Sequence, residues 1–238
     1  MPGCGAPASY GSEVTQTDGP SVSILLVTYN APRHVLHILR QLRSNTSGVD
    51  HEVVVVDNAS RWPTRLLVTL ARWSGFANRV ALLDRNTLFA EGCNIAASLS
   101  ARDSDYVLML NPDTQPQRPD WLAHLVALHE RGATGYGFVD NAPDHQPLPR
   151  ADGYCLLVDR DLFLEVGMDE DFAWWWSATR LQAGLLERGH AVRAVADHQE
   201  WLTHVGGASG KAWKGARGME VTVEEVRGWF GQEQPQRI

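Results

Sequence analysis

Nearly continuous apolar runs alternate with stretches of helical spacing in the first half of the chain. The apolar runs lie at residues 22–27, 53–56, 80–83 and 106–110. Such runs are typical of strands that are buried on both faces of a parallel sheet. The stretches that follow them predict helices at 32–42, 66–73, 93–99 and 120–130. This alternation predicts an α/β fold with a mainly parallel sheet flanked by helices.

The pattern is less regular after Gly132, where a loop rich in Pro and Asp covers residues 141–149. Beyond this loop we expect strands at 154–158 and 191–196, and helices at 160–166, 174–188 and 220–230. The segment 206–218, rich in Gly and Lys, is expected to be mobile. The chain therefore divides into a flexible tail, a folded domain and a C-terminal segment with a terminal helix, at 1–20, 21–210 and 211–238.

Composition and charge narrow the function classes. The 238 residues are 44% hydrophobic and 21% charged, which is ordinary for a globular protein. A net charge of -7 argues against general nucleic-acid binding and against docking on an anionic membrane by bulk charge, but leaves a local basic patch open. No apolar run approaches the roughly 20 residues that span a bilayer, and no signal peptide is evident. We expect a cytoplasmic protein without an integral membrane segment.

The three cysteines predict neither a disulfide framework nor a thiolate metal site. They are odd in number, far apart and form no CxxC pair: Cys4, Cys93 and Cys155. Such sparse cysteines fit a reducing compartment.

Polar side chains follow three of the predicted strands. The clusters are Thr28-Tyr29-Asn30, Asp57-Asn58 and Asn111-Pro112-Asp113. Ligands of open α/β sheets bind outside the carboxyl ends of the strands, so these clusters predict a binding site.

Each candidate residue has two interpretations. Asp113 would hold a divalent cation while a diphosphate supplies further oxygens, or it forms an Asx-turn. Asp57 would accept hydrogen bonds from a base or ribose, or it caps the next helix. His204, beside Gly206 and Gly207, would be a second metal ligand, or it is an ordinary surface histidine. The stretch from Asn86 to Asn94 would bind an anion at a helix N-terminus, or it is a plain capping loop.

The motifs occur in an order that resembles family 2 glycosyltransferases with the GT-A fold. They are TYN, VDNAS, N-x-x-F-A-x-G-C-N, LNPDT, a Gly-containing strand, G-x-D-E-x-F and a late His-x-Gly-Gly. The resemblance covers about residues 22–209 and is strongest to the bacterial branch that includes rhamnosyltransferases.

The resemblance implies transfer of a sugar from a dTDP- or UDP-linked donor, with inversion at the anomeric carbon. The acceptor would be a saccharide, a lipid-linked intermediate or a small natural product. Asp113 would hold Mg2+ or Mn2+ with His204 as the late ligand, and Asp57 would contact the nucleobase. The other donor-site residues implied are Thr28, Asn30, Asn86, Asn94 and Asn111.

The sequence departs from the family at the catalytic base. The family carries Glu-Asp at the start of the helix after G-x-D-E-x-F, and its Asp is the general base. Ser177 and Ala178 stand at those two places, and Arg180 replaces a further acidic residue. Leu88 replaces the usual glycine before Phe89, which would narrow the donor pocket.

Three accounts of the missing base remain open. In the first, another carboxylate serves as base, and the candidates are Asp152, Glu170, Asp171 and Glu200. In the second, the acceptor is already ionised, or the leaving diphosphate takes the proton in a front-face mechanism. In the third, the protein binds a nucleotide sugar or a partner without transfer. General base catalysis contributes typically 10²–10⁴-fold, so its loss need not abolish turnover.

Two further features leave alternatives open. Trp174-Trp175-Trp176 cannot share one helix face, so at least one ring faces a cavity or solvent. This ring would stack on a sugar or planar acceptor, or two of the rings are core and one is an ordinary surface residue. Arg180 would pair with an acidic acceptor or with Glu170 or Asp171. No GxGxxG follows the first strand and no GxxxxGK[ST] occurs, which argues against dehydrogenases and P-loop proteins.

Overall fold

The computed structural model describes residues 19–206 and 215–238, with Trp175 described by its backbone alone. One mixed sheet of eight strands runs through it, in the order β12-β10-β6-β9-β4-β1-β2-β3. Among these strands β9 alone runs antiparallel to its neighbours, β4 and β6. The strands are β1 (Ser21–Thr28), β2 (Asp50–Asp57), β3 (Arg79–Leu82), β4 (Tyr106–Leu110), β6 (Gly132–Tyr136), β9 (Cys155–Asp159), β10 (Ala191–Val195) and β12 (Gln236–Arg237).

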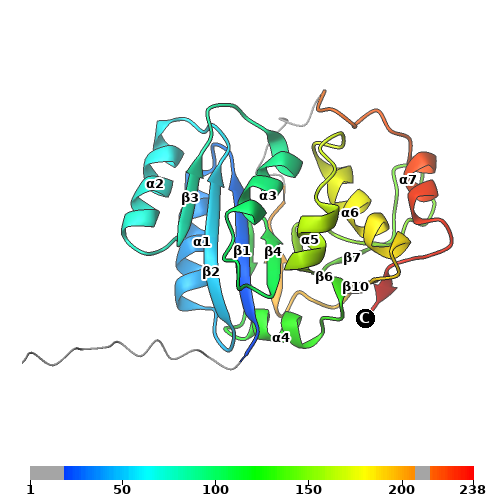
Figure 1. The fold of residues 1–238 in the computed structure, drawn as a ribbon, viewed down its shortest axis with the longest axis horizontal. Coiled ribbons are helices and arrows are strands. Elements are labelled where there is room, and N and C mark those ends of the chain that lie inside the picture. Colours follow the sequence, from blue (N-terminus) through cyan, green and yellow to red (C-terminus); the bar gives the residue numbers. More distant parts are fainter. Residues whose placement is uncertain (1–18, 207–214) are drawn as a thin grey trace, which may run out of the picture.

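Helices cover both faces of this sheet (Figure 1). They are α1 (Pro32–Ser44), α2 (Trp62–Trp73), α3 (Leu88–Ser98), α4 (Trp121–Ala127), α5 (Arg160–Val166), α6 (Trp175–Glu187) and α7 (Val223–Phe230). Side chains alternate across each strand, so Ile24 and Leu26 pack with α1, α2 and α4, whereas Leu25 packs with α3, α5 and α6. The fold class predicted from the sequence is therefore confirmed.

Two small strand pairs lie outside the main sheet. Strand β5 (Thr114–Pro116) pairs antiparallel with β11 (Leu202–His204), and His204 is opposite Thr114. Strand β7 (Phe138–Val139) pairs with β8 (Arg150–Ala151). The first pair brings residue 204 next to the end of β4, although 91 residues separate His204 from Asp113.

The structure corrects the element boundaries of the sequence analysis. The helix expected at 93–99 already begins at Leu88, and the one expected at 120–130 ends at Ala127. The pattern also missed the short pairs and β6, whose sequence Gly-Ala-Thr-Gly-Tyr has low strand propensity. All five residues of β6 are buried between β9 and β10, so tertiary pairing decides their conformation.

The C-terminal segment joins the same core. Helix α7 packs on α6 through Val226 and Phe230, and β12 pairs parallel with β10 (Figure 1). The terminal helix expected at 220–230 begins at Val223, where Thr222 and Glu225 form a capping box. Residues 1–18 of the tail expected over 1–20 lie outside the described residues. The same holds for residues 207–214 of the mobile segment expected over 206–218. No helix among the described residues is long and apolar enough to cross a membrane.

Candidate functional site

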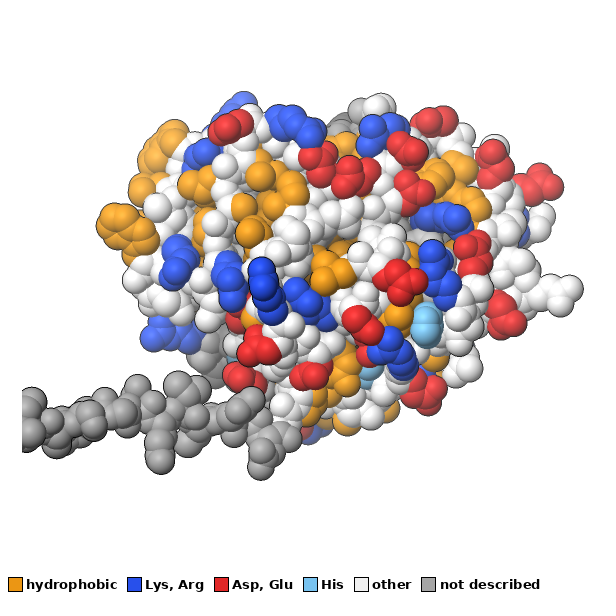
Figure 2. All heavy atoms as spheres, viewed as in Figure 1, with side chains coloured by type: hydrophobic (Ala, Val, Ile, Leu, Met, Phe, Trp, Pro, Cys, Tyr) orange, Lys and Arg blue, Asp and Glu red, His pale blue; other side chains and the backbone are white. Residues whose placement is uncertain are grey.

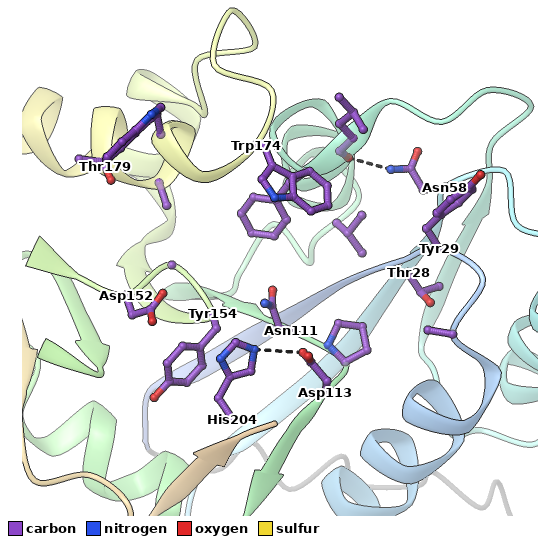
Figure 3. A pocket seen from close by; sticks show the side chains of 18 of the residues that line it. Thr28, Tyr29, Asn58, Asn111, Asp113, Asp152, Tyr154, Trp174, Thr179 and His204 are labelled. Atoms are coloured by element: carbon purple, nitrogen blue, oxygen red, sulfur yellow. Dashed lines mark hydrogen bonds and ion pairs between the residues drawn. The ribbon is translucent and has the colours of Figure 1, made fainter. Parts of the chain in front are cut away.

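A pocket of about 470 Å³ opens at the carboxyl ends of β1, β2 and β4. Its walls come from the loop after β1, the loop before α3, the turn after β4, and the chain between β8 and α6 (Figure 3). Parallel strands deliver their polar ends to one edge of the sheet, which explains why residues distant in sequence meet here. Thr28, Asn86, Asn111, Asp113 and His204 all line this pocket.

Asp113 and His204 face each other across the floor of the pocket (Figure 3). The Nε2 atom of His204 lies 3.2 Å from Oδ1 of Asp113, and the Asp113 side chain is 8% exposed. Burial alone raises the pKa of Asp113, but the hydrogen bond and charge of His204 outweigh it and lower the pKa below its ordinary value. Asp113 is therefore ionised near neutral pH.

The ring of Tyr154 packs against this pair. Its ring stacks on the imidazole of His204 with 4.3 Å between ring centroids. Its hydroxyl lies 2.6 Å from Nε2 of His198, which fixes the direction of the phenol. Because burial raises the pKa of Tyr154, the phenol stays neutral and holds the histidine by stacking rather than by charge.

Two buried oxygens at the neighbouring ends of β1 and β2 have no hydrogen-bond partner among the described residues. They are Oγ1 of Thr28 and Oδ1 of Asp57, and the two residues are paired in the strand register. The other Asp57 oxygen accepts from the backbone N–H of Ser60 at 3.1 Å, so part of the helix-capping interpretation holds. Thr28 lines the pocket, whereas Asp57 is fully buried and does not line it. Unpaired buried oxygens are costly, and a bound ligand with an N–H or O–H group would pair with the Thr28 oxygen at the pocket wall.

The loop before α3 is held rigidly at the pocket. The side chain of Asn58 accepts from the backbone N–H of Thr87 at 2.7 Å and donates to the carbonyl of Leu88 at 2.7 Å. Asn86 accepts from the backbone N–H of Leu88 at 2.9 Å. Leu88 has a φ of 63°, the left-handed region in which glycine carries no steric cost. This conformation explains why glycine suits position 88, and Leu88 fills pocket space that a glycine would leave open.

Asn30 and Asn94 do not line the pocket. Asn30 accepts from the backbone N–H of Arg61 at 2.7 Å and so ties the loop after β1 to the loop after β2. Asn94 bonds the backbone of Met168 and a carboxylate oxygen of Glu170. Both asparagines therefore shape the site through the loops they hold rather than through contact with its interior.

The four candidate bases are separated by the fold. Asp152 lines the pocket. Glu170 bonds Asn94, Asp171 is exposed and pairs with Arg217, and Glu200 is exposed, so none of these three lines it. Asp113 and Asp152 are the two carboxylates among the residues that line the pocket.

The two positions that the resemblance assigns to a Glu-Asp pair, Ser177 and Ala178, hold no ionisable group. Ser177 is fully buried, and its hydroxyl donates to the carbonyl of Trp174 at 2.5 Å. Ala178 lines the pocket with its methyl group. Arg180 pairs with Glu187, two helical turns further along α6, at 3.2 Å, and not with Glu170 or Asp171.

Two rings of the tryptophan run line the pocket. Trp174 lies at its upper wall opposite His204 (Figure 3), and Trp176 reaches it from a core cluster with Val226 and Phe230. The side chain of Trp175 lies outside the described part. Arg150 lines the same wall, with its guanidinium 5.8 Å from the Trp176 ring centroid. This wall therefore combines aromatic faces with one cation.

Sequence reasoning missed Arg150, His34 and Tyr154 as pocket residues. His34 has a weak sequence signal, since it lies one turn into the helix that begins after the first polar strand end. Arg150 follows the irregular loop at 141–149, and Tyr154, expected to begin a strand, lies in the turn before β9, so tertiary contacts decide the path of both. Nothing in the local sequence distinguishes them from surface residues.

The donor set fits a divalent cation in part. An ionised carboxylate and an imidazole within hydrogen-bond distance are suitable ligands for Mn2+, and the carboxylate for Mg2+. Within residues 19–206 and 215–238 no third His, Cys, Asp or Glu joins them as a ligand cluster. A cation here would therefore take its remaining ligands from water and a bound diphosphate.

Solved structures share this fold. The mannosyltransferase PcManGT from Pyrobaculum calidifontis, in complex with GDP-Man and Mn2+, is 20% identical with a TM-score of 0.58, over 74% of this chain and 54% of that one. S. aureus TarS 1–349 in complex with UDP-GlcNAc is 16% identical with a TM-score of 0.52, over 69% and 53%. This chain thus spans about half the length of these GT-A glycosyltransferases. No curated protein matches the sequence.

A family model for glycosyl transferase family 2 matches residues 23–172. This range contains β1 to α5, the loop before α3 and the turn with Asp113, and it ends before α6. It covers more than half of the sequence, and the pocket lies at the strand ends within it. The chain belongs to glycosyl transferase family 2.

Proposed function

We propose that this protein transfers a sugar from a dTDP- or UDP-linked donor to an acceptor hydroxyl, with inversion and with Asp152 as the general base. One observation supports the donor part above others: a single pocket contains an ionised Asp113 paired with His204 and is lined by Thr28, whose buried Oγ1 has no partner among the described residues. A nucleoside would offer N–H and O–H groups to Thr28, and a diphosphate would share a cation with Asp113.

Asp113 and His204 would hold Mg2+ or Mn2+ in this proposal. The cation would neutralise charge on the diphosphate as the bond to the sugar breaks. The two structural neighbours contain nucleotide sugars, and one of them contains Mn2+, which supports this class of donor in general. Arg150 lines the same pocket and would add positive charge toward the diphosphate, and His34 would offer it a ring N–H.

Asp152 would accept the proton of the acceptor hydroxyl. The next residue, Gly153, lies against Ala178. Ala178 is at the position that the resemblance assigns to the base, so Asp152 is one residue away from a contact with that position. The acceptor oxygen would attack the anomeric carbon on the face opposite the diphosphate, which leaves as the carbon–oxygen bond breaks. Trp174 and Trp176 would stack on the sugar or acceptor and exclude water.

Two measurements test this function. Calorimetric titration of UDP and dTDP, with and without Mn2+, should show metal-dependent binding that Asp113→Asn abolishes. Asp152→Asn should lower the rate of sugar transfer from the donor to an acceptor by about 10²–10⁴-fold. The affinity for the nucleotide should stay unchanged. Glu170→Gln is the matched control, because Glu170 lies outside the pocket. Equal activity of Asp152→Asn and wild type would exclude Asp152 as base and favour an already ionised acceptor or a front-face mechanism.

A protein that binds a nucleotide sugar without transfer is the second candidate. The buried Ser177 and the methyl group of Ala178 favour it, since neither can accept a proton. Nucleotide binding by the wild type together with no transfer to saccharide, lipid-linked or small-molecule acceptors would support this alternative.

A further inference from the structure

Helix α2 carries apolar side chains on two opposite faces. Its inner face buries Val68 and Ala71 against the sheet. Its outer face exposes a stripe spaced at four, four and three residues: Trp62 at 75%, Leu66 at 50%, Leu70 at 53% and Trp73 at 84%. A surface helix usually carries polar residues on its outer side. The outer stripe therefore has no explanation in the packing of residues 19–206 and 215–238.

The stripe continues into a groove between α1 and α2. Leu36 of α1, exposed to 38%, lines the groove together with Leu66, Leu70 and Phe76. We call Leu36, Trp62, Leu66, Leu70 and Trp73 the α1–α2 face. Figure 2 shows hydrophobic side chains gathered at the edge of the molecule where α2 lies, with basic side chains beside them. Contiguous exposed apolar surface of this kind marks an interaction site.

The charge around this face is opposite to that of the whole protein. Residues 31–49 and 58–83 contain no Asp or Glu, although the chain has a net charge of -7. The same two segments contain seven arginines: Arg33, Arg40, Arg43, Arg61, Arg65, Arg72 and Arg79. Five of the seven are exposed and have no carboxylate partner among the described residues: Arg33, Arg40, Arg43, Arg61 and Arg72. A local basic and apolar surface therefore exists on an acidic protein.

We propose that the α1–α2 face docks this protein on an anionic lipid bilayer. Tryptophans prefer the boundary between lipid headgroups and acyl chains, leucines enter the acyl region, and arginines are attracted to an anionic surface. A second copy fits less well, because a two-fold contact would place unpaired arginines opposite each other. Nucleic acid fits less well, because the exposed Leu66 and Leu70 would contact phosphates. This inference is independent of the proposed sugar transfer.

The face shares helix α1 with the pocket. Ala31 and His34 at the start of α1 line the pocket, while Leu36 and Arg40 further along line the groove. A bilayer bound at this face would lie against the same helix that borders the candidate site. A lipid-linked acceptor would then be the first class of acceptor to assay.

Co-sedimentation of the full chain with vesicles tests the inference. We expect binding to vesicles of phosphatidylcholine with phosphatidylglycerol, weak binding to phosphatidylcholine alone, and loss of binding at high salt. Trp62→Ser with Trp73→Ser should lower vesicle binding at least about tenfold, as should Arg40→Glu with Arg72→Glu. Leu164→Ser is the matched control, because Leu164 is exposed to 48% on α5, away from this face.

The four substituted residues are exposed, so the variants should keep the thermal midpoint of the wild type. Absence of vesicle binding by the wild type would overturn the inference, and so would equal binding by the tryptophan variant and the Leu164→Ser control. A dimer in analytical ultracentrifugation that Trp62→Ser with Trp73→Ser dissociates would assign the face to a second copy instead.

Discussion

Gly153 lies directly against Ala178: a Cβ atom added to Gly153 would be 2.7 Å from the Cβ of Ala178. Real Cβ atoms do not approach so closely, so position 153 has room for a hydrogen and no more. The contact joins the turn that carries Asp152 to the first turn of α6. It therefore holds Asp152 and Ala178, which both line the pocket, on adjoining segments.

This contact predicts that Gly153→Ala destabilises the protein. Overpacking of this kind costs typically about 1–3 kcal/mol in the free energy of unfolding. Adding Ala178→Gly to the same chain should recover a large part of that cost, because it removes the opposing methyl group. Denaturant unfolding of both single variants and the double variant measures the coupling. Gly228→Ala is a control in open space on α7, and additive effects of the two substitutions at the contact would contradict the prediction.

The same contact predicts a rescue of the base. If Asp152 accepts the proton, Ala178→Asp in an Asp152→Asn background should restore at least about tenfold of the lost turnover, since a general base contributes about 10²–10⁴-fold. The reason is that both side chains line one pocket and lie on adjoining elements. Ala178→Asn in the same background matches the size without the charge. Equal rates for the Asp and Asn variants at position 178 would show that the restored carboxylate does not act as base.

The φ of 63° at Leu88 predicts an unusual order of stabilities. Glycine normally destabilises relative to alanine, but a left-handed residue other than glycine pays about 1–2 kcal/mol. Leu88→Gly should therefore unfold at a higher denaturant concentration than Leu88→Ala, which loses the side chain and keeps the strain. Paired denaturant curves measure the difference. A more stable alanine variant would contradict the argument from backbone strain.

His129 predicts a loss of stability in mild acid. Burial disfavours its charged form and lowers its pKa below the ordinary value, although the charge and hydrogen bond of Asp159 oppose this shift. The unfolded chain then binds a proton at higher pH than the folded chain does. The contribution is complete above the ordinary histidine pKa of about 6.5 and is lost as the pH falls below it, by up to about 1.4 kcal/mol per pH unit.

His129→Gln removes this titration and should flatten the fall in unfolding free energy between neutral and mildly acidic pH. His37→Gln, on the exposed side of α1, should leave the wild-type slope unchanged. Parallel curves for His129→Gln and wild type would show that other groups cause the acid sensitivity.

Local patterns along the chain predict the alternating elements and the edge of the sheet at which polar residues gather. Apolar runs such as Val53 to Val56 are buried on both faces of the sheet. Such a continuous apolar run predicts a strand without knowledge of its neighbours. The polar residues after them, among them Thr28 and Asp113, reach one pocket because parallel strands end at the same edge. The local sequence is enough to predict both features, because each strand and the polar residues at its end are neighbours along the chain.

Which side chains face the pocket and which face solvent depends on packing between distant segments. Asp152 and Glu170 look equivalent as sequence candidates, yet the first lines the pocket and the second bonds Asn94, because packing of β8 and α6 directs them. On α2, Val68 and Leu66 are both apolar residues in a helical pattern, yet Val68 is buried against the sheet and Leu66 is exposed. The pattern does not distinguish these two faces of the helix. That choice depends on contacts between segments distant in sequence, which no local pattern encodes.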